Sequence, residues 1–235
     1  MLVWVASYPR SGNRFFRHTL NLLYGQRSLR VYSDGTDHGP QAKDRLILDY
    51  ASQQECMFIK THDLPASDRY PTIYLLRDGR DSLVSYAWFH LTVDRKLDKA
   101  DISPALYKRI LRDLMLMRES DFGTWSDNVT AWTGRPQTTI VRFEDLVAKP
   151  EETVANALAE LELELPPIPN SQVQTFDELK LEKQRLFRRG KVGSWQDEFP
   201  QELMDLFWQE HGQVMQQFRY GENDLPHLTV NRLVA

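Results

Sequence analysis

A short polar segment early in the sequence, Arg10–Arg14, carries residue types that bind anions. It follows the apolar run Val3–Ala6, which predicts a buried strand, and Pro9 ends that strand because proline has no N–H to donate to a sheet. Apolar residues at helical spacing then predict a helix that stops at Gly25. A helix N-terminus beside two arginines typically binds phosphate, and the alternative is an ordinary turn whose arginines are solvated.

Other polar residues follow two more predicted strands. Lys60 and His62 lie at the end of one of them, and Arg77 follows the next. Ligands of parallel sheets bind at the carboxyl ends of the strands, so we expect these side chains to lie near Arg10. His62 suits proton transfer, since the unperturbed pKa of histidine is near ~6.5. In the alternative interpretation Arg77 only pairs with nearby carboxylates and His62 only caps a turn.

The predicted elements alternate between strands and helices. Strands are expected at residues 3–7, 57–61, 72–76 and 139–143, and helices at residues 16–23, 46–50, 82–90, 106–117, 125–132, 150–163, 177–186 and 201–218. Asp81 is expected to be the N-cap of the helix that follows it. The alternation predicts an α/β fold in which helices cover both faces of a central parallel sheet, as a single domain over residues 1–235. Residues 26–43 are expected to form a loop that acts as a functional flap.

Size and composition fit a globular protein that binds an anion only locally. The chain has 235 residues, of which 41% are hydrophobic and 26% charged, and its formal net charge is −4. This acidic balance argues against a nucleic-acid partner. The single cysteine, Cys56, excludes an intramolecular disulfide. No targeting segment and no apolar run near ~20 residues is visible, so we expect a cytoplasmic protein without a membrane span.

The loop around Arg10 lacks the pattern G-x-x-x-x-G-K-[ST], which argues against an ATPase or a kinase. Residues 7–15 read S-Y-P-R-S-G-N-R-F and resemble the 5′-phosphosulfate loop of the sulfotransferases, whose usual form is T-Y-P-K-S-G-T-T-W. Residues 60–65, K-T-H-D-L-P, are similar to the family's catalytic segment K-T-H-x-P. Residues 77–86, R-D-G-R-D-S-L-V-S-Y, are similar to its 3′-phosphate motif R-[ND]-x-[KR]-D-x-x-x-S-Y.

Three further segments continue the resemblance in the family's order. Residues 143–146 read F-E-D-L where the family has Y-E-D and a hydrophobic residue, and residues 174–176 read Q-T-F where it has T-S-F. Residues 188–195, R-R-G-K-V-G-S-W, are similar to R-K-G-x-x-G-D-W. Together the motifs extend from residue 5 to residue 195, and the chain resembles the sulfotransferases that use 3′-phosphoadenosine 5′-phosphosulfate (PAPS), in the compact form of bacterial and cytosolic members.

The resemblance implies a P-loop-containing NTPase-like fold and an enzyme that transfers a sulfuryl group from PAPS to a hydroxyl or amine of a small-molecule acceptor. The product of the donor is 3′,5′-bisphosphoadenosine (PAP), and no metal is required. The resemblance further implies in-line displacement with His62 as general base, and with Lys60 and Arg10 as the other catalytic residues. The residues implied in donor binding are Arg10, Ser11, Gly12, Asn13, Arg14, Phe15, Arg77, Ser85, Phe143, Phe176, Arg188, Arg189 and Gly190.

Several positions depart from the family pattern. Arg10 stands where the family has lysine, and its planar fork contacts anions differently from a point charge. Asn13 and Arg14 replace two threonines, Phe15 replaces tryptophan, and Gln174 replaces a threonine near the base. The dimer signal K-x-x-x-T-V-x-x-x-E is absent after residue 195, so the sequence predicts no oligomeric state.

Two other functions stay open from the sequence alone. One is a nucleotide or nucleoside kinase on a related P-loop scaffold, which magnesium-dependent ATP binding would favour. The other is a non-catalytic anion-binding domain, which tight PAP binding without transfer would favour. The acceptor site is expected among residues 26–43, 89–97 and 125–132.

Overall fold

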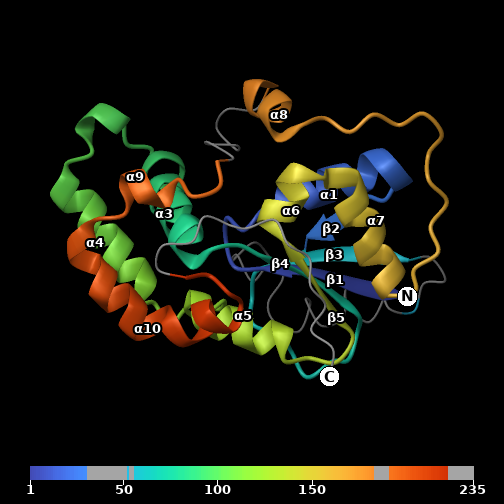
Figure 1. Ribbon diagram of the computed structural model, residues 1–235, viewed down its shortest axis with the longest axis horizontal. Coiled ribbons are helices and arrows are strands. Elements are labelled where there is room, and N and C mark those ends of the chain that lie inside the picture. The colour runs from blue at the N-terminus through green and yellow to red at the C-terminus, as the bar shows by residue number, and fades with distance from the viewer. Residues whose placement is uncertain (31–51, 53–55, 183–190, 222–235) are drawn as a thin grey trace.

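The computed structural model describes residues 1–30, 52, 56–182 and 191–221. Within these residues, five parallel strands form a central sheet (Figure 1) in the order β2-β3-β1-β4-β5. The strands are β1 (Leu2–Ser7), β2 (Ser28–Arg30), β3 (Met57–Thr61), β4 (Thr72–Leu76) and β5 (Thr138–Arg142). β1 lies in the middle and pairs with β3 on one side and with β4 on the other. The predicted helix at residues 46–50 and residues 31–43 of the predicted flap lie outside the described residues.

Two strand predictions differ from the structure. The sequence predicts a loop at residues 26–43, but residues 28–30 form the edge strand β2, which pairs with β3. A strand of three residues has too few side chains to show an alternating pattern, and its partner strand decides its conformation. β5 ends at Arg142 and not at Phe143, because Phe143 begins helix α6 (Phe143–Ala148).

Helices cover both faces of the sheet, as the alternation predicts (Figure 1). The core on one face includes side chains of α1 (Asn13–Tyr24), α6 and α7 (Pro150–Glu160). The core on the other includes side chains of α3 (Gly79–Phe89), α4 (Pro104–Met115), α5 (Trp125–Thr133) and α10 (Met204–Gln217). The shorter elements are the π-helix η1 (His90–Asp94), the 3₁₀ helices η2 (Lys99–Asp101) and η3 (Gln201–Leu203), and the α-helices α8 (Phe176–Glu182) and α9 (Trp195–Glu198).

Helix α1 forms where the spacing of its apolar residues predicts it. Phe16, Leu20 and Leu23 are buried on its inner face. The helix begins after Gly12 and ends before Gly25, and both glycines have a positive φ, 94° and 68° respectively. Because this region of backbone conformation favours glycine, the two residues set the bounds of the helix.

Gly12 is held in place by its backbone and by its surroundings. A Cβ atom at this position would lie 2.5 Å from the ring of Phe143, and φ is already +94°. We expect Gly12→Ala to lower the free energy of unfolding by about 1–3 kcal/mol, measured by denaturant titration. The control is Gly134→Ala, since Gly134 has an ordinary φ of −79° and is expected to lose at most about 1 kcal/mol. Equal losses in the two variants would contradict this explanation.

Helix α3 begins earlier than predicted. Its N-cap is Asp78, whose carboxylate accepts a hydrogen bond from the backbone N–H of Arg80 at 2.8 Å. The prediction of Asp81 as N-cap is therefore wrong. Asp81 lies within the first turn, where its carboxylate accepts three hydrogen bonds from residues 193–195. A long-range contact, which spacing along the helix does not reveal, decides between the two aspartates.

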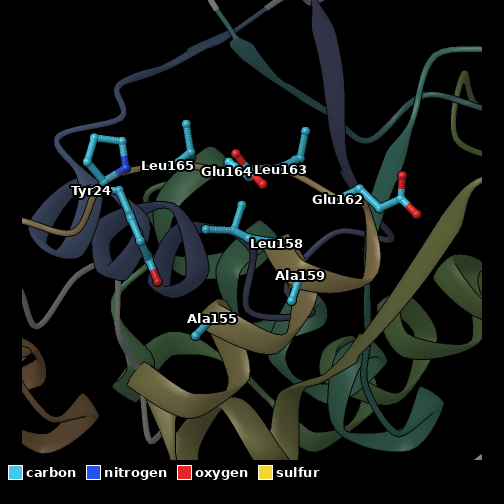
Figure 2. A pocket seen from close by; sticks show the side chains of 9 residues that line it. Tyr24, Ala155, Leu158, Ala159, Glu162, Leu163, Glu164 and Leu165 are labelled. Carbon is cyan, nitrogen blue, oxygen red and sulfur yellow. The ribbon is translucent and has the colours of Figure 1, made fainter.

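A surface groove lies between the C-terminal end of α1 and helix α7, with a volume of about 980 Å³ (Figure 2). Leu158 and Leu163 are buried there, and Glu162 and Glu164 are exposed. The groove contains none of the residues that the sequence assigns to catalysis or donor binding. No helix in the described part of the chain is long and apolar enough to cross a membrane.

Candidate active site

Three segments that are far apart in the sequence meet at the carboxyl ends of β1, β3 and β4. Nδ1 of His62, which follows β3, lies 2.7 Å from the carbonyl oxygen of Ser7 at the end of β1. Arg77, which follows β4, donates a hydrogen bond to the carbonyl oxygen of Arg10 at 3.2 Å. Lys60 lies in β3 and is buried. The structure thus places four of the predicted residues at the same edge of the sheet.

Arg10 has an unusual backbone and reaches toward α3. Its φ of 70° is rare for a residue other than glycine and costs on the order of 1–3 kcal/mol, a strain that clusters at functional sites. Its Nε donates to Oγ of Ser85 at 3.3 Å, and its guanidinium lies 4.7 Å from the centre of the Phe89 ring. The sequence assigned Arg10 and Ser85 to opposite ends of the donor, and in the structure they are in contact. Ser85 is in the second turn of α3, which begins at Gly79.

Arg77 joins the first loop to the C-terminal part of the chain. One of its Nη atoms donates to the carbonyl oxygen of Arg10, and the other donates to that of Lys191 at 3.3 Å. Its guanidinium also lies 3.5 Å from Asp81 and 4.2 Å from the centre of the Phe143 ring. Within the described residues, its buried Nε has no hydrogen-bond partner. Among the buried donors that lack a partner in the described part of the chain, this one belongs to a residue that the resemblance implies in donor binding.

The carboxylate of Asp81 anchors the end of the C-terminal basic loop beside Arg77. It accepts hydrogen bonds from the backbone N–H groups of Gly193 and Trp195 and from Oγ of Ser194, each at 2.9 Å. Arg188, Arg189 and Gly190, which the resemblance implies in donor binding, lie outside the described residues. Just before this anchor in the sequence, the carbonyl oxygen of Lys191 accepts a hydrogen bond from Arg77.

Three phenylalanines predicted to bind the donor form one aromatic cluster. The ring of Phe176 lies 5.3 Å from that of Phe15 and 6.0 Å from that of Phe143, both edge to face. Phe15 and Phe143 are buried, and Phe176 is half-buried. The rings come from α1, α6 and α8, so three distant segments build an aromatic surface next to Gly12.

The other residues of the first loop divide between the interior and the surface. Ser11 is buried, and its Oγ lies 3.2 Å from that of Ser82. Asn13 is buried, and its side-chain amide donates to the carbonyl oxygen of Val5 at 2.9 Å. Arg14 is exposed. The asparagine that replaces a family threonine therefore directs its side chain toward β1.

His62 is held in one tautomer. Because the carbonyl oxygen of Ser7 only accepts hydrogen bonds, Nδ1 of His62 carries the proton and Nε2 is the unprotonated nitrogen of the neutral ring. The pKa of His62 is lowered to about 3. Burial is the largest cause, and the positive charges of Lys60, Arg17 and Arg10 act in the same direction. The hydrogen bond to Ser7 acts in the opposite direction. In the free protein the ring is thus uncharged at neutral pH.

Helix α5 supports the segment that carries His62. Nδ2 of Asn128 donates to the carbonyl oxygen of His62 at 2.9 Å, and Nε1 of Trp132 donates to that of Asp63 at 2.9 Å. Trp125 and Trp132 are fully buried in the core. This helix thus positions the backbone beside the catalytic histidine candidate, and a role of residues 125–132 in the acceptor site stays a prediction.

The start of α1 is a favourable place for a negative charge. In the described structure no side chain caps this helix, and its first turn contains no acidic residue. A helix N-terminus of this kind attracts anions, and Arg10 adds a full positive charge next to it. Among the described residues, no group of three or more histidine, cysteine or carboxylate side chains is placed to hold a metal ion.

A parallel sheet with a cationic loop between β1 and α1 defines a P-loop-like class of anion-binding protein. The sequence model of the sulfotransferase domain family matches residues 2–219, and the chain belongs to this family of transferases. Rat sulfotransferase 1E1 is 24% identical over 246 residues, which cover 89% of this chain and 81% of the relative. Rat sulfotransferase 1 family member D1 is 20% identical over 259 residues, which cover 92% and 83%.

Solved sulfotransferase structures share the fold. Mouse sulfotransferase SULT7A1 complexed with PAP superimposes with a TM-score of 0.63 and 17% identity, covering 91% of this chain and 84% of that one. Retinol dehydratase in complex with androsterone and the inactive cofactor PAP gives a TM-score of 0.61 and 18% identity, covering 97% and 82%. The P-loop NTPase-like fold and the family implied by the sequence motifs are therefore confirmed.

Proposed function

We propose that this chain transfers a sulfuryl group from PAPS to a hydroxyl or amine of a small-molecule acceptor. The observation that carries the proposal is the meeting of Arg10, His62 and Arg77 at the strand ends, in a member of the sulfotransferase family. Structural neighbours described as complexes with PAP, and with androsterone or retinol, support a nucleotide donor and a small acceptor.

The chain's own residues fit a donor with phosphate at both ends of its ribose. The start of α1 and Arg10 would hold the 5′ end, and Nε of Arg77 with Ser85 would hold the 3′-phosphate. The family resemblance adds Arg188, Arg189 and Gly190 to the second group. The half-buried ring of Phe176, which packs against the buried Phe15 and Phe143, would contact the base.

The bound donor supplies an activated sulfuryl group, and the chain supplies orientation, charge and a base. Nε2 of His62 accepts the proton of the acceptor's hydroxyl or amine, since Nδ1 already carries the ring's proton in the tautomer fixed by Ser7. Lys60 and Arg10 stabilise negative charge that develops on the leaving oxygen. Positioning and charge stabilisation carry such a transfer, so no metal is needed.

The pKa of His62 is expected to rise when the donor or PAP binds. Negative charge beside the ring offsets the charges of Lys60, Arg17 and Arg10, which lower the pKa of His62 in the free protein. Nuclear magnetic resonance of the imidazole should show a neutral ring from about pH 5 upward in the free protein, and a titration shifted to higher pH with PAP. A pKa that stays unchanged or falls with PAP would contradict the proposed placement of the donor.

Transfer itself is tested by incubating the protein with labelled PAPS and a panel of phenols, alcohols and amines. A product heavier by one sulfuryl group, formed together with PAP, is the expected result. Saturable PAP binding without transfer to any acceptor would favour a binding domain instead.

A further inference from the structure

A chain of hydrogen bonds connects Arg17 on the outer part of α1 to the candidate general base. Nε of Arg17 donates to Oδ1 of Asn13 at 2.9 Å, one helical turn earlier. A second nitrogen of the same guanidinium donates to Oγ of Ser28 in β2 at 2.7 Å. Arg17 therefore fixes both the side chain of Asn13 and the position of α1 relative to the edge of the sheet.

The direction of these hydrogen bonds follows from their chemistry. An arginine only donates, so the oxygen of the Asn13 amide must face Arg17 and its nitrogen must face β1. That nitrogen donates to the carbonyl oxygen of Val5 at 2.9 Å and to Oγ of Ser7 at 3.3 Å. Arg17 thus determines which way the amide of Asn13 points.

Ser7 passes this constraint to His62. Its carbonyl oxygen and its Oγ lie 2.7 Å and 3.2 Å from Nδ1 of His62. The carbonyl requires a proton on Nδ1, which leaves Nε2 as the basic atom. The sequence motifs missed this connection because Arg17 lies outside all of them, and only the four-residue spacing from Asn13 could have indicated a contact.

We propose that Arg17 is a positioning residue for His62, acting through Asn13 and Ser7 to fix the orientation of the imidazole ring that Ser7 holds at Nδ1. The inference rests on the proposed function, in which His62 is the general base. The charge of Arg17 gives it a second effect on the same ring. The charged groups that act on His62 are Lys60 in β3, Arg10 in the loop after β1 and Arg17 in α1, and all three disfavour protonation.

The test compares Arg17→Met with Arg109→Met, since Arg109 is an exposed arginine on α4, away from the site. We expect Arg17→Met to lower kcat by roughly ten- to a hundred-fold while the Kd for PAP and the KM for PAPS change little. The acid limb of the pH profile should move to higher pH, because one positive charge near His62 is lost. Arg109→Met should match the wild type in all of these.

A ¹⁵N spectrum of the histidine side chains provides a readout that needs no turnover. The wild-type protein should show His62 protonated at Nδ1, and Arg17→Met should show a higher pKa for the ring, because one of the positive charges that lower it is lost. A wild-type His62 protonated at Nε2 would overturn the inference even if the variant does not fold. So would an Arg17→Met protein with wild-type kcat, pH profile and ¹⁵N spectrum. If no acceptor is ever sulfated, the proposed function fails while the ¹⁵N result still decides the positioning.

Discussion

Replacement of His62 by alanine is expected to lower kcat by roughly 10²- to 10⁴-fold and to leave the Kd for PAP nearly unchanged. The general base is lost, whereas the groups proposed to hold the donor come from Arg10, Arg77 and the start of α1. Steady-state assays with PAPS give kcat, and calorimetric titration with PAP gives the Kd.

His62→Asn separates the base from its structural role. The amide nitrogen of asparagine can replace Nδ1 as donor to the carbonyl oxygen of Ser7, but asparagine has no basic nitrogen. Both variants should therefore lose turnover to a similar extent. An asparagine variant that turns over at nearly the wild-type rate would show that His62 only holds the loop after β3.

Arg77→Met is expected to weaken PAP binding by roughly ten- to a hundred-fold, because a charge-assisted hydrogen bond contributes about 1.5–3 kcal/mol. Arg77 is buried and contacts the first loop, Asp81 and Lys191. Its Nε is one of several buried donors that lack a partner within the described residues. Calorimetry with PAP measures the loss.

Adenosine 5′-monophosphate distinguishes a direct contact from a general weakening, because it lacks the 3′-phosphate. The wild type should bind PAP more tightly than this nucleotide, and Arg77→Met should lose most of the preference. If both nucleotides weaken by the same factor, Arg77 supports the site without contacting the 3′-phosphate. Thermal unfolding of the variant, compared with Arg109→Met, checks that the fold is retained.

Local patterns were sufficient to predict much of the fold. The apolar run before Pro9 and the spacing of Phe16, Leu20 and Leu23 predicted β1 and α1, since both elements are defined by residues close in sequence. The order of strands and helices predicted the parallel sheet with two covered faces. Because the strands are parallel, the polar residues that follow β1, β3 and β4 were expected to meet. Arg10, His62 and Arg77 do so in the structure.

Long-range contacts account for what the sequence could not predict. Asp81 looked like a helix cap, and its partners lie more than 110 residues away at residues 193–195. The contact between Arg10 and Ser85 depends on how the first loop lies against α3, which no spacing within either segment encodes.

The chain has arginine at position 10 where the family has lysine, and this difference has a structural consequence. The guanidinium contacts Oγ of Ser85 and also the face of the Phe89 ring. A planar group can make a hydrogen bond at its edge and a cation–π contact on its face, which an ammonium group does less well. Arg10 therefore connects the proposed donor site to the part of α3 that the sequence predicts to border the acceptor.

Calorimetric titration of the wild-type protein with PAP in the presence of a metal chelator is the decisive test of the proposed donor site. We expect saturable binding of PAP at one site without metal, tighter than that of adenosine 5′-monophosphate and retained in His62→Asn. Failure of PAP to bind, or binding only of ATP and only with magnesium, would contradict it.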